Sequence, residues 1–170
     1  MRTKRFRLGI KGVLIALTWM LFAPYKVQAQ YESNAVAAYS EIWHTDFVIA
    51  QQEAQITNKP IVMVFSGSDW CMPCILLKAQ ILDTNPFVEY ALENYVLMNV
   101  DFPRETLTHG VFSDAQIELI KKYNPTRGVP TVLVVHPNGR ILGQVKHQRN
   151  ITPQEYIWQI NSFVRQGGIR

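Results

Sequence analysis

Cys71 and Cys74 are the residues whose type and spacing could do chemistry, because two thiols three positions apart can form a disulfide; they are the chain's only cysteines. A disulfide between them would close a loop too small to restrict the unfolded chain strongly, so it would stabilise the folded state little. A zinc site would need a second CxxC or a closely spaced His pair. The four histidines form no such pair: His44, His109, His136 and His147. The spacing therefore favours a redox-active pair.

The elements predicted around the cysteines suit this chemistry. Residues 61–65 (IVMVF) have the length and apolar character of a strand buried on both faces, and a helix is predicted over 71–82. Cys71 would then lie at the helix N-terminus, where unpaired N–H groups and the helix dipole favour the thiolate. Cys74 would lie one turn further on, shielded and able to attack a mixed disulfide. Trp70, directly before the motif, is expected to line a groove beside the thiol.

The rest of the chain predicts an α/β protein. Further helices are predicted over residues 46–57, 85–93, 113–123 and from 152 onward. Further strands are predicted over residues 95–101, 131–136 and 140–146. Residues 103–110 are expected to form a loop with a solvated His109. Buried strands that alternate with helices, followed by a hairpin and a closing helix, imply a central mixed β-sheet flanked by helices on both faces.

Three helix starts carry capping signals. Asn85 is predicted to cap one helix, with Pro86 at its first position. Residues 113–116 (SDAQ) and 152–155 (TPQE) each fit a capping box. These signals set the expected boundaries of the helices.

Length, composition and charge exclude several classes of protein. The chain has 170 residues, enough for one domain and a short extra segment, and 48% of them are apolar, which excludes wholesale disorder. The formal charge of +4 comes from residues 1–29, which hold six of the 17 Lys and Arg residues and no acid. Residues 30–170 keep 11 basic and 13 acidic residues, a net charge of −2. No nucleic-acid partner is therefore expected.

Residues 1–29 have the three-part layout of a secretory signal peptide. A basic stretch (2–11) precedes a twelve-residue apolar run (12–23), and residues 27–29 (VQA) offer the small side chains of a cleavage site. The apolar run is shorter than the roughly 20 residues that span a bilayer. We expect a cleavable signal, a linker over 30–40, and an exported protein, periplasmic or extracellular, with no stable membrane span. An uncleaved anchor is the alternative.

Four motifs carry a resemblance to a known family. They are Phe65-Ser-Gly-Ser-Asp-Trp-Cys-Met-Pro-Cys74, Asn99-Val-Asp101, Gly128-Val-Pro-Thr131 and Pro137-Asn-Gly139. Together they resemble the thioredoxin superfamily over about residues 41–166. The leading segment around Ile42-Trp43 is similar to the exported thioredoxin-like group, which includes the C-terminal domain of the periplasmic thiol:disulfide interchange (electron-relay) protein. The resemblance implies a thioredoxin-like domain over residues 41–170.

The resemblance also implies a role for each matching residue. Cys71 corresponds to the attacking thiol and Cys74 to the resolving thiol of the redox-active disulfide. Pro130 corresponds to the cis-proline that faces the disulfide. Val129 would offer backbone hydrogen bonds to a bound peptide.

One position departs from the thioredoxin pattern. Thioredoxins carry a buried Asp on the strand before the motif. With one extra residue in the following loop, that position is Val64; without it, the position is Phe65. Asp69 is closer in sequence and is expected in the exposed loop. The sequence therefore does not identify the group that takes the proton of Cys74.

The sequence predicts an exported thiol–disulfide oxidoreductase that acts on protein clients, needs no cofactor or metal, and is recycled by a membrane or soluble redox partner. Pro73 before Cys74 matches thioredoxins and favours a reductase or interchange protein over a strong oxidant. Val129 before Pro130 points the other way, because the superfamily's oxidant also carries it. The alternative is a thioredoxin-fold metallochaperone or binding module that carries copper on the two thiolates. Copper carriers usually show CxxxC and a dedicated His, which this chain lacks.

Overall fold

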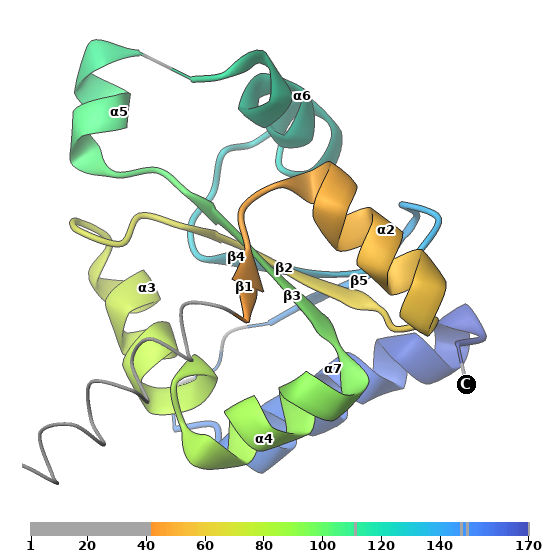
Figure 1. Cartoon of the computed structure of the whole chain (residues 1–170). Helices are drawn as coiled ribbons and strands as arrows, with labels where there is room; N and C mark the ends of the chain where they lie inside the picture. The colour runs from red at the N-terminus through yellow and green to blue at the C-terminus, as the bar shows by residue number, and fades with distance from the viewer. Residues whose placement is uncertain (1–41, 111, 147, 149, 170) are drawn as a thin grey trace, which may run out of the picture. The chain divides into compact units, whose positions relative to one another are not determined.

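A five-stranded mixed β-sheet runs through the domain in the strand order β1-β3-β2-β4-β5 (Figure 1). The strands are β1 (Trp43–His44), β2 (Ile61–Ser66), β3 (Val96–Asp101), β4 (Thr131–Val135) and β5 (Ile141–Val145). Strands β1 and β2 are parallel to β3, whereas β4 is antiparallel to both β2 and β5. Consequently β2 and β3 finish, and β4 begins, at one end of the sheet, which we call the redox end.

The computed structural model describes residues 42–110, 112–146, 148 and 150–169. All of them fall in one unit of the chain, Glu41–Arg170. The predicted signal peptide over 1–29 and the linker over 30–40 lie outside the described residues and stay predictions.

Side chains of β2 alternate between two apolar cores, one on each face of the sheet, because successive residues of a strand point to opposite faces. Val62 and Val64 pack in the first core, which we call the α3 core. Ile61, Met63 and Phe65 pack in the second, the α2 core. All five are buried, as expected for a strand covered on both faces.

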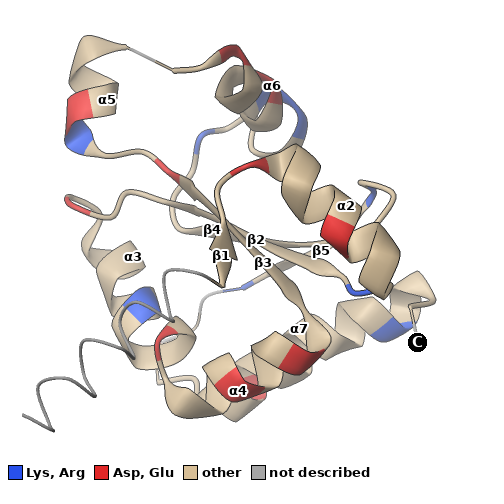
Figure 2. Ribbon diagram, viewed as in Figure 1, with Lys and Arg blue, Asp and Glu red and all other residues tan. Residues whose placement is uncertain are grey.

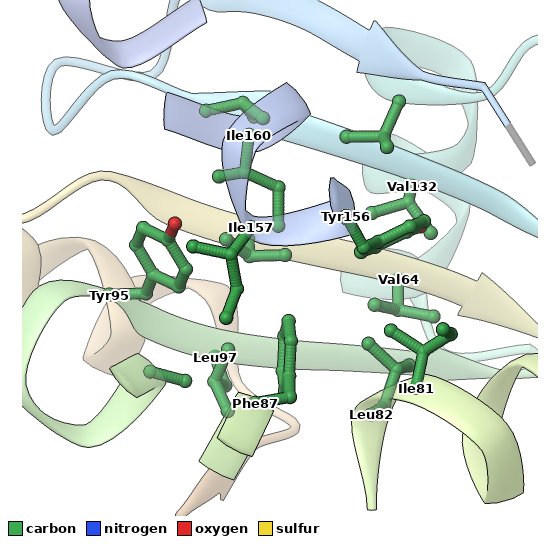
Figure 3. Close-up of a cluster of buried hydrophobic side chains, with 14 of the residues drawn as sticks. Val64, Ile81, Leu82, Phe87, Tyr95, Leu97, Val132, Tyr156, Ile157 and Ile160 are labelled. Atoms are coloured by element: carbon green, nitrogen blue, oxygen red, sulfur yellow. The ribbon is translucent and has the colours of Figure 1, made fainter. Parts of the chain in front are cut away.

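Helices cover both faces of the sheet (Figure 1). The α3 core lies under α3 (Met72–Leu77), α4 (Asn85–Asn94) and α7 (Pro153–Gly167). The α2 core lies under α2 (Phe47–Thr57) and α6 (Asp114–Tyr123). Figure 3 shows the α3 core, where Tyr156 of α7 lies with Val64, Val132 and Ile81. The predicted fold class, a mixed sheet with helices on both faces, is confirmed.

Both predicted capping boxes are present. Ser113 and Gln116 bond reciprocally at the start of α6, and Thr152 and Glu155 do the same at the start of α7. The backbone and side-chain hydrogen bonds from Thr152 hold the pKa of Glu155 below its usual value. These two helices therefore begin where the sequence predicts.

The start of α4 differs from the prediction by one residue. The Thr84 carbonyl accepts the N–H of Val88 at 2.9 Å, so Thr84 is the N-cap, Asn85 the first helical residue and Pro86 the second. The Thr84 hydroxyl donates to the carbonyl of Ile81 at 2.6 Å. The assignment of Asn85 as cap was wrong, because the first helical hydrogen bonds are accepted by the Thr84 carbonyl.

The helix predicted over 71–82 is not regular. After α3 it continues as a π-helical turn, η1 (Lys78–Leu82), in which the N–H of Asp83 donates to the Lys78 carbonyl at 2.8 Å. An extra residue in the turn rotates the helix. Ile81 and Leu82, both in this turn, pack in the α3 core.

Two short elements were not predicted. Strand β1 has only two residues and pairs with Leu97 and Met98 of β3. The segment expected as a loop over 103–110 contains a helix, α5 (Arg104–His109), and His109 is its exposed last residue. Elements this short show no hydrophobic periodicity, so the sequence pattern cannot reveal them.

Candidate active site

The two cysteines form a disulfide at the start of α3. The S–S distance is 2.05 Å and the two Cα atoms lie 5.2 Å apart. Strand β2 ends at Ser66, and the loop over 67–71 delivers Cys71 to the helix as its N-cap residue. Each cysteine is 5% exposed, so burial does not distinguish them in the oxidised protein.

Position in the helix does distinguish the two cysteines. The Cys71 sulfur accepts the backbone N–H of Cys74 at 3.3 Å. The same N–H also donates to the Cys71 carbonyl at 2.9 Å, so the sulfur shares an amide of the first helical turn, where the helix dipole favours a negative charge. A thiolate at Cys71 would receive this hydrogen bond directly. Cys74 lies inside the helix, as the third residue of α3.

A cis peptide bond precedes β4 at the redox end. It joins Val129 to Pro130, and both residues are half-buried. Phe65 of β2 pairs with Thr131 of β4, so the Val129–Pro130 bond lies beside the point where β2 leaves the sheet toward the cysteines. The Gly128 carbonyl accepts hydrogen bonds from Asn124 (3.0 Å) and Thr131 (2.8 Å), which fix the loop.

The Trp70 side chain is anchored next to the motif. Its indole Nε1 donates to the carbonyl of Phe102, just after β3, at 2.6 Å. Its ring lies so close to Gly67 that a Cβ atom there would collide with the indole. Even so, 37% of Trp70 is exposed. The five predicted site residues therefore lie at the redox end, and their roles toward a client remain predictions.

Asp101 holds the loop that carries the cysteines, a role that the sequence analysis missed. Its carboxylate accepts hydrogen bonds from the Ser66 hydroxyl (3.1 Å), the Ser68 backbone N–H (2.9 Å) and the Ser68 hydroxyl. Hydrogen bonds to a charged group are about twice as strong as neutral ones. The available signal was the pair of serines before the motif, together with the Asp that ends the neighbouring strand.

Asp69 lies in the exposed loop, as expected, and also has a partner. Both of its carboxylate oxygens accept the backbone N–H of Arg104, at 3.0 and 3.1 Å. This amide starts α5, so the loop before Cys71 caps the inserted helix. Figure 2 shows acidic residues (red) both at the end of β3 and in the loop before α3.

Val64 and Phe65 are the two positions that the resemblance offers for the buried acid of thioredoxins. Val64 is 4% exposed and packs in the α3 core with Leu77 and Ile81, whereas Phe65 packs in the α2 core on the opposite face. Val64, like Val62, therefore lies on the face of β2 that is covered by the helix bearing Cys74. Between Asn99 and Val132 of the neighbouring strands, its side chain offers no group that could take a proton.

The described residues give no support to a metal site or a membrane span. Within them, no group of three His, Cys, Asp or Glu side chains could hold a metal ion. His44 pairs instead with Glu53 at 2.7 Å. Of the helices in the described ranges, none combines the length and apolar character needed to cross a bilayer.

A protein-family model described as a thioredoxin-like domain matches residues 47–158. The chain belongs to this thioredoxin-like family. It is 29% identical over 114 residues to "Disulfide bond reductase DsbH" of Chlamydia pneumoniae, a match that covers 67% of this chain and 68% of that protein. A solved structure, "DsbH Oxidoreductase", has a TM-score of 0.62 at 27% identity and covers 72% of this chain and 83% of its own.

The fold also resembles that of the reduced DsbD C-terminal domain of Neisseria meningitidis. The TM-score is 0.50 at 19% identity, with 66% of this chain and 89% of that chain covered. Among thioredoxin-like proteins, a cysteine pair at the start of the helix after β2 is the redox centre. With its Cys71–Cys74 disulfide in that place, the chain is a thioredoxin-fold disulfide oxidoreductase.

Proposed function

We propose that this protein is an exported reductase or interchange protein that passes electrons from its Cys71–Cys74 dithiol to disulfides of protein clients. The observation that carries the choice of nucleophile is the hydrogen bond from the Cys74 N–H to the Cys71 sulfur at the helix start, because it favours a thiolate at Cys71. The reductase named DsbH among its relatives is consistent with this direction.

The reaction moves two electrons in two displacement steps. The Cys71 thiolate attacks one sulfur of the client disulfide, forms a mixed disulfide and releases the other client sulfur as a thiolate. The Cys74 thiolate then attacks the Cys71 sulfur and closes the intramolecular disulfide. The client leaves with two thiols, and the protein is left oxidised.

The surroundings of the disulfide fit an extended client segment. The Val129–Pro130 bond lies beside the end of β2, so the Val129 backbone is available to a peptide laid along the redox end. Trp70 would line the other side, since its indole is fixed by Phe102. The Val129 contact needs only a peptide backbone on the client.

Direction and location rest on the sequence. Pro73, which is exposed in the first turn of α3, is the residue that thioredoxins carry before the second cysteine. The signal-like residues 1–29 support export. Outside the cytosol, the oxidised cysteine pair would need a second dithiol protein to reduce it again. Such a partner closes the cycle.

The test is reduction of insulin in the presence of dithiothreitol, combined with trapping. The wild type should accelerate precipitation of the released insulin chain, and Cys71→Ser should remove that acceleration. Cys74→Ser should accumulate a mixed disulfide, because attack proceeds and resolution does not. Equal trapping by Cys71→Ser and Cys74→Ser on a non-reducing gel would refute the assignment of roles.

A further inference from the structure

The inserted helix α5 is held by the loop over 67–71, which carries Cys71, rather than by the core. None of its six residues is buried. A helix this short is not stable on its own. Its first N–H is bonded to the Asp69 carboxylate at 3.0 and 3.1 Å, and Gly110 closes its other end in the left-handed conformation that favours glycine (φ 66°).

Two further bonds fix the base of α5 to the segment that precedes Cys71. The Trp70 indole donates to Phe102, two residues before α5, and the Ser68 backbone donates to Asp101 at 2.9 Å. Figure 1 shows α5 rising above this segment at the redox end of the sheet. The position of α5 is thereby coupled to that of the cysteine loop.

The middle of α5 presents an apolar side chain to solvent. Leu107 is 46% exposed, and Met72, between the cysteines, is 62% exposed. A mixed disulfide with Cys71 necessarily brings the client's cysteine, and the residues on either side of it, to this end of the sheet. A large apolar residue on the client would lose contact with water when it packs against Leu107.

We propose that α5 is a client-recognition element, in which Leu107 contacts an apolar side chain within a few residues of the client's reactive cysteine. The inference rests on the proposed function and adds the class of client: an extended polypeptide whose cysteine is flanked by large apolar residues. Asp69 is a positioning residue in this arrangement, because it fixes α5 relative to Cys71.

The experiment compares two disulfide-linked peptides that differ only in whether Leu or Ser flanks the cysteine, with 5,5′-dithiobis(2-nitrobenzoate) as a small disulfide. The variants are Leu107→Ser, Leu107→Met and the control Leu92→Ser. Leu92 is also exposed (52%) but lies on α4, which leads into the opposite end of β3.

The wild type should reduce the Leu-flanked peptide with the lower KM. Leu107→Ser should raise that KM roughly tenfold, the order expected for losing an apolar contact, and leave kcat and the small disulfide unchanged. Leu107→Met and Leu92→Ser should behave like the wild type. The proposal is overturned if Leu107→Ser keeps the preference for Leu, or if it slows all three substrates equally. A wild type that reduces no disulfide would overturn the proposed function itself.

Discussion

Replacing Val64 by aspartate would put a carboxyl group into the α3 core, at one of the two positions that the resemblance offers for the buried acid of thioredoxins. Val64 is buried and packs with Leu77 and Ile81. Among the described residues, apolar side chains and two tyrosines form this core, and Asn99 of β3 is the polar strand partner of Val64. The new carboxyl would therefore have little to compensate for its removal from water.

The expected loss of stability has two parts. Removing a buried valine side chain forfeits about 1.5–3 kcal/mol of burial. Leaving a neutral carboxyl without partners costs about 1–3 kcal/mol more. The free energy of unfolding should thus fall by about 2.5–6 kcal/mol near pH 4, a large share of the roughly 5–15 kcal/mol of a typical domain.

The loss should grow with pH. A buried acid holds its proton more tightly in the folded than in the unfolded state, so its folded-state pKa lies above the unfolded value of about 3.9. Stability then decreases as pH rises from the unfolded to the folded pKa, by about 1.4 kcal/mol per pH unit. Val64→Asn is the matched control, because asparagine has the same size and does not ionise.

The assay is urea unfolding of the oxidised variants and wild type between about pH 4 and pH 8. Val64→Asp should lose stability relative to wild type with rising pH, and Val64→Asn should show a loss that is independent of pH. A loss below about 1 kcal/mol, or identical pH profiles for the two variants, would show that water or a proton acceptor reaches position 64, and would refute this reasoning.

Three further predictions concern other groups. Tyr156→Phe should leave stability unchanged or raise it by about 1 kcal/mol, because burial raises the pKa of this phenol and its hydroxyl has no partner among the described residues. Tyr95→Phe should lower stability, because the Tyr95 hydroxyl donates to Asn161 at 2.8 Å; urea unfolding of both variants measures the two effects. Resolution of the mixed disulfide by Cys74 should be the slow step and should accelerate as pH rises into the alkaline range, since no acid side chain at position 64 takes its proton; a fast rate that does not vary with pH in quenched-flow gels would contradict this. Exported protein should begin at the residue after Ala29, and N-terminal sequencing that finds the original terminus would favour the anchor.

Much of the scaffold was predictable because it depends on local patterns. The apolar run of β2 and the capping boxes at Ser113 and Thr152 each involve residues close in sequence, and each was predicted with the correct type of element. The cysteine pair was equally visible. Patterns of this kind act through hydrogen bonding and burial within one element, so the rest of the fold does not alter them.

The residues that support the cysteine loop were not predictable in the same way. Asp101 bonds to Ser66 and Ser68 only because β2 and β3 pair in parallel with Ser66 opposite Asp101. Asp69 caps α5 across 35 positions of sequence. Contacts of this kind depend on strand register, which a single sequence does not reveal.

The position of Val64 shows where structure resolves a choice that sequence leaves open. Counting back from the motif gave Val64 or Phe65 as the counterpart of the thioredoxin acid, depending on one residue in the loop. Alternation along β2 puts Val64 on the α3 face and Phe65 on the α2 face. Of the two candidates, Val64 is the one on the face of the helix that bears Cys74, and its side chain carries no group that could take a proton.

The reduction potential of the Cys71–Cys74 pair tests the proposed direction of electron flow most directly. It is measured by equilibrating the protein with glutathione or dithiothreitol buffers at neutral pH and quantifying the free thiols. A reductase or interchange protein should lie near thioredoxin, at about −270 mV, and in any case below about −230 mV. A potential above about −180 mV, toward the roughly −120 mV of a strong oxidant, would contradict the proposal.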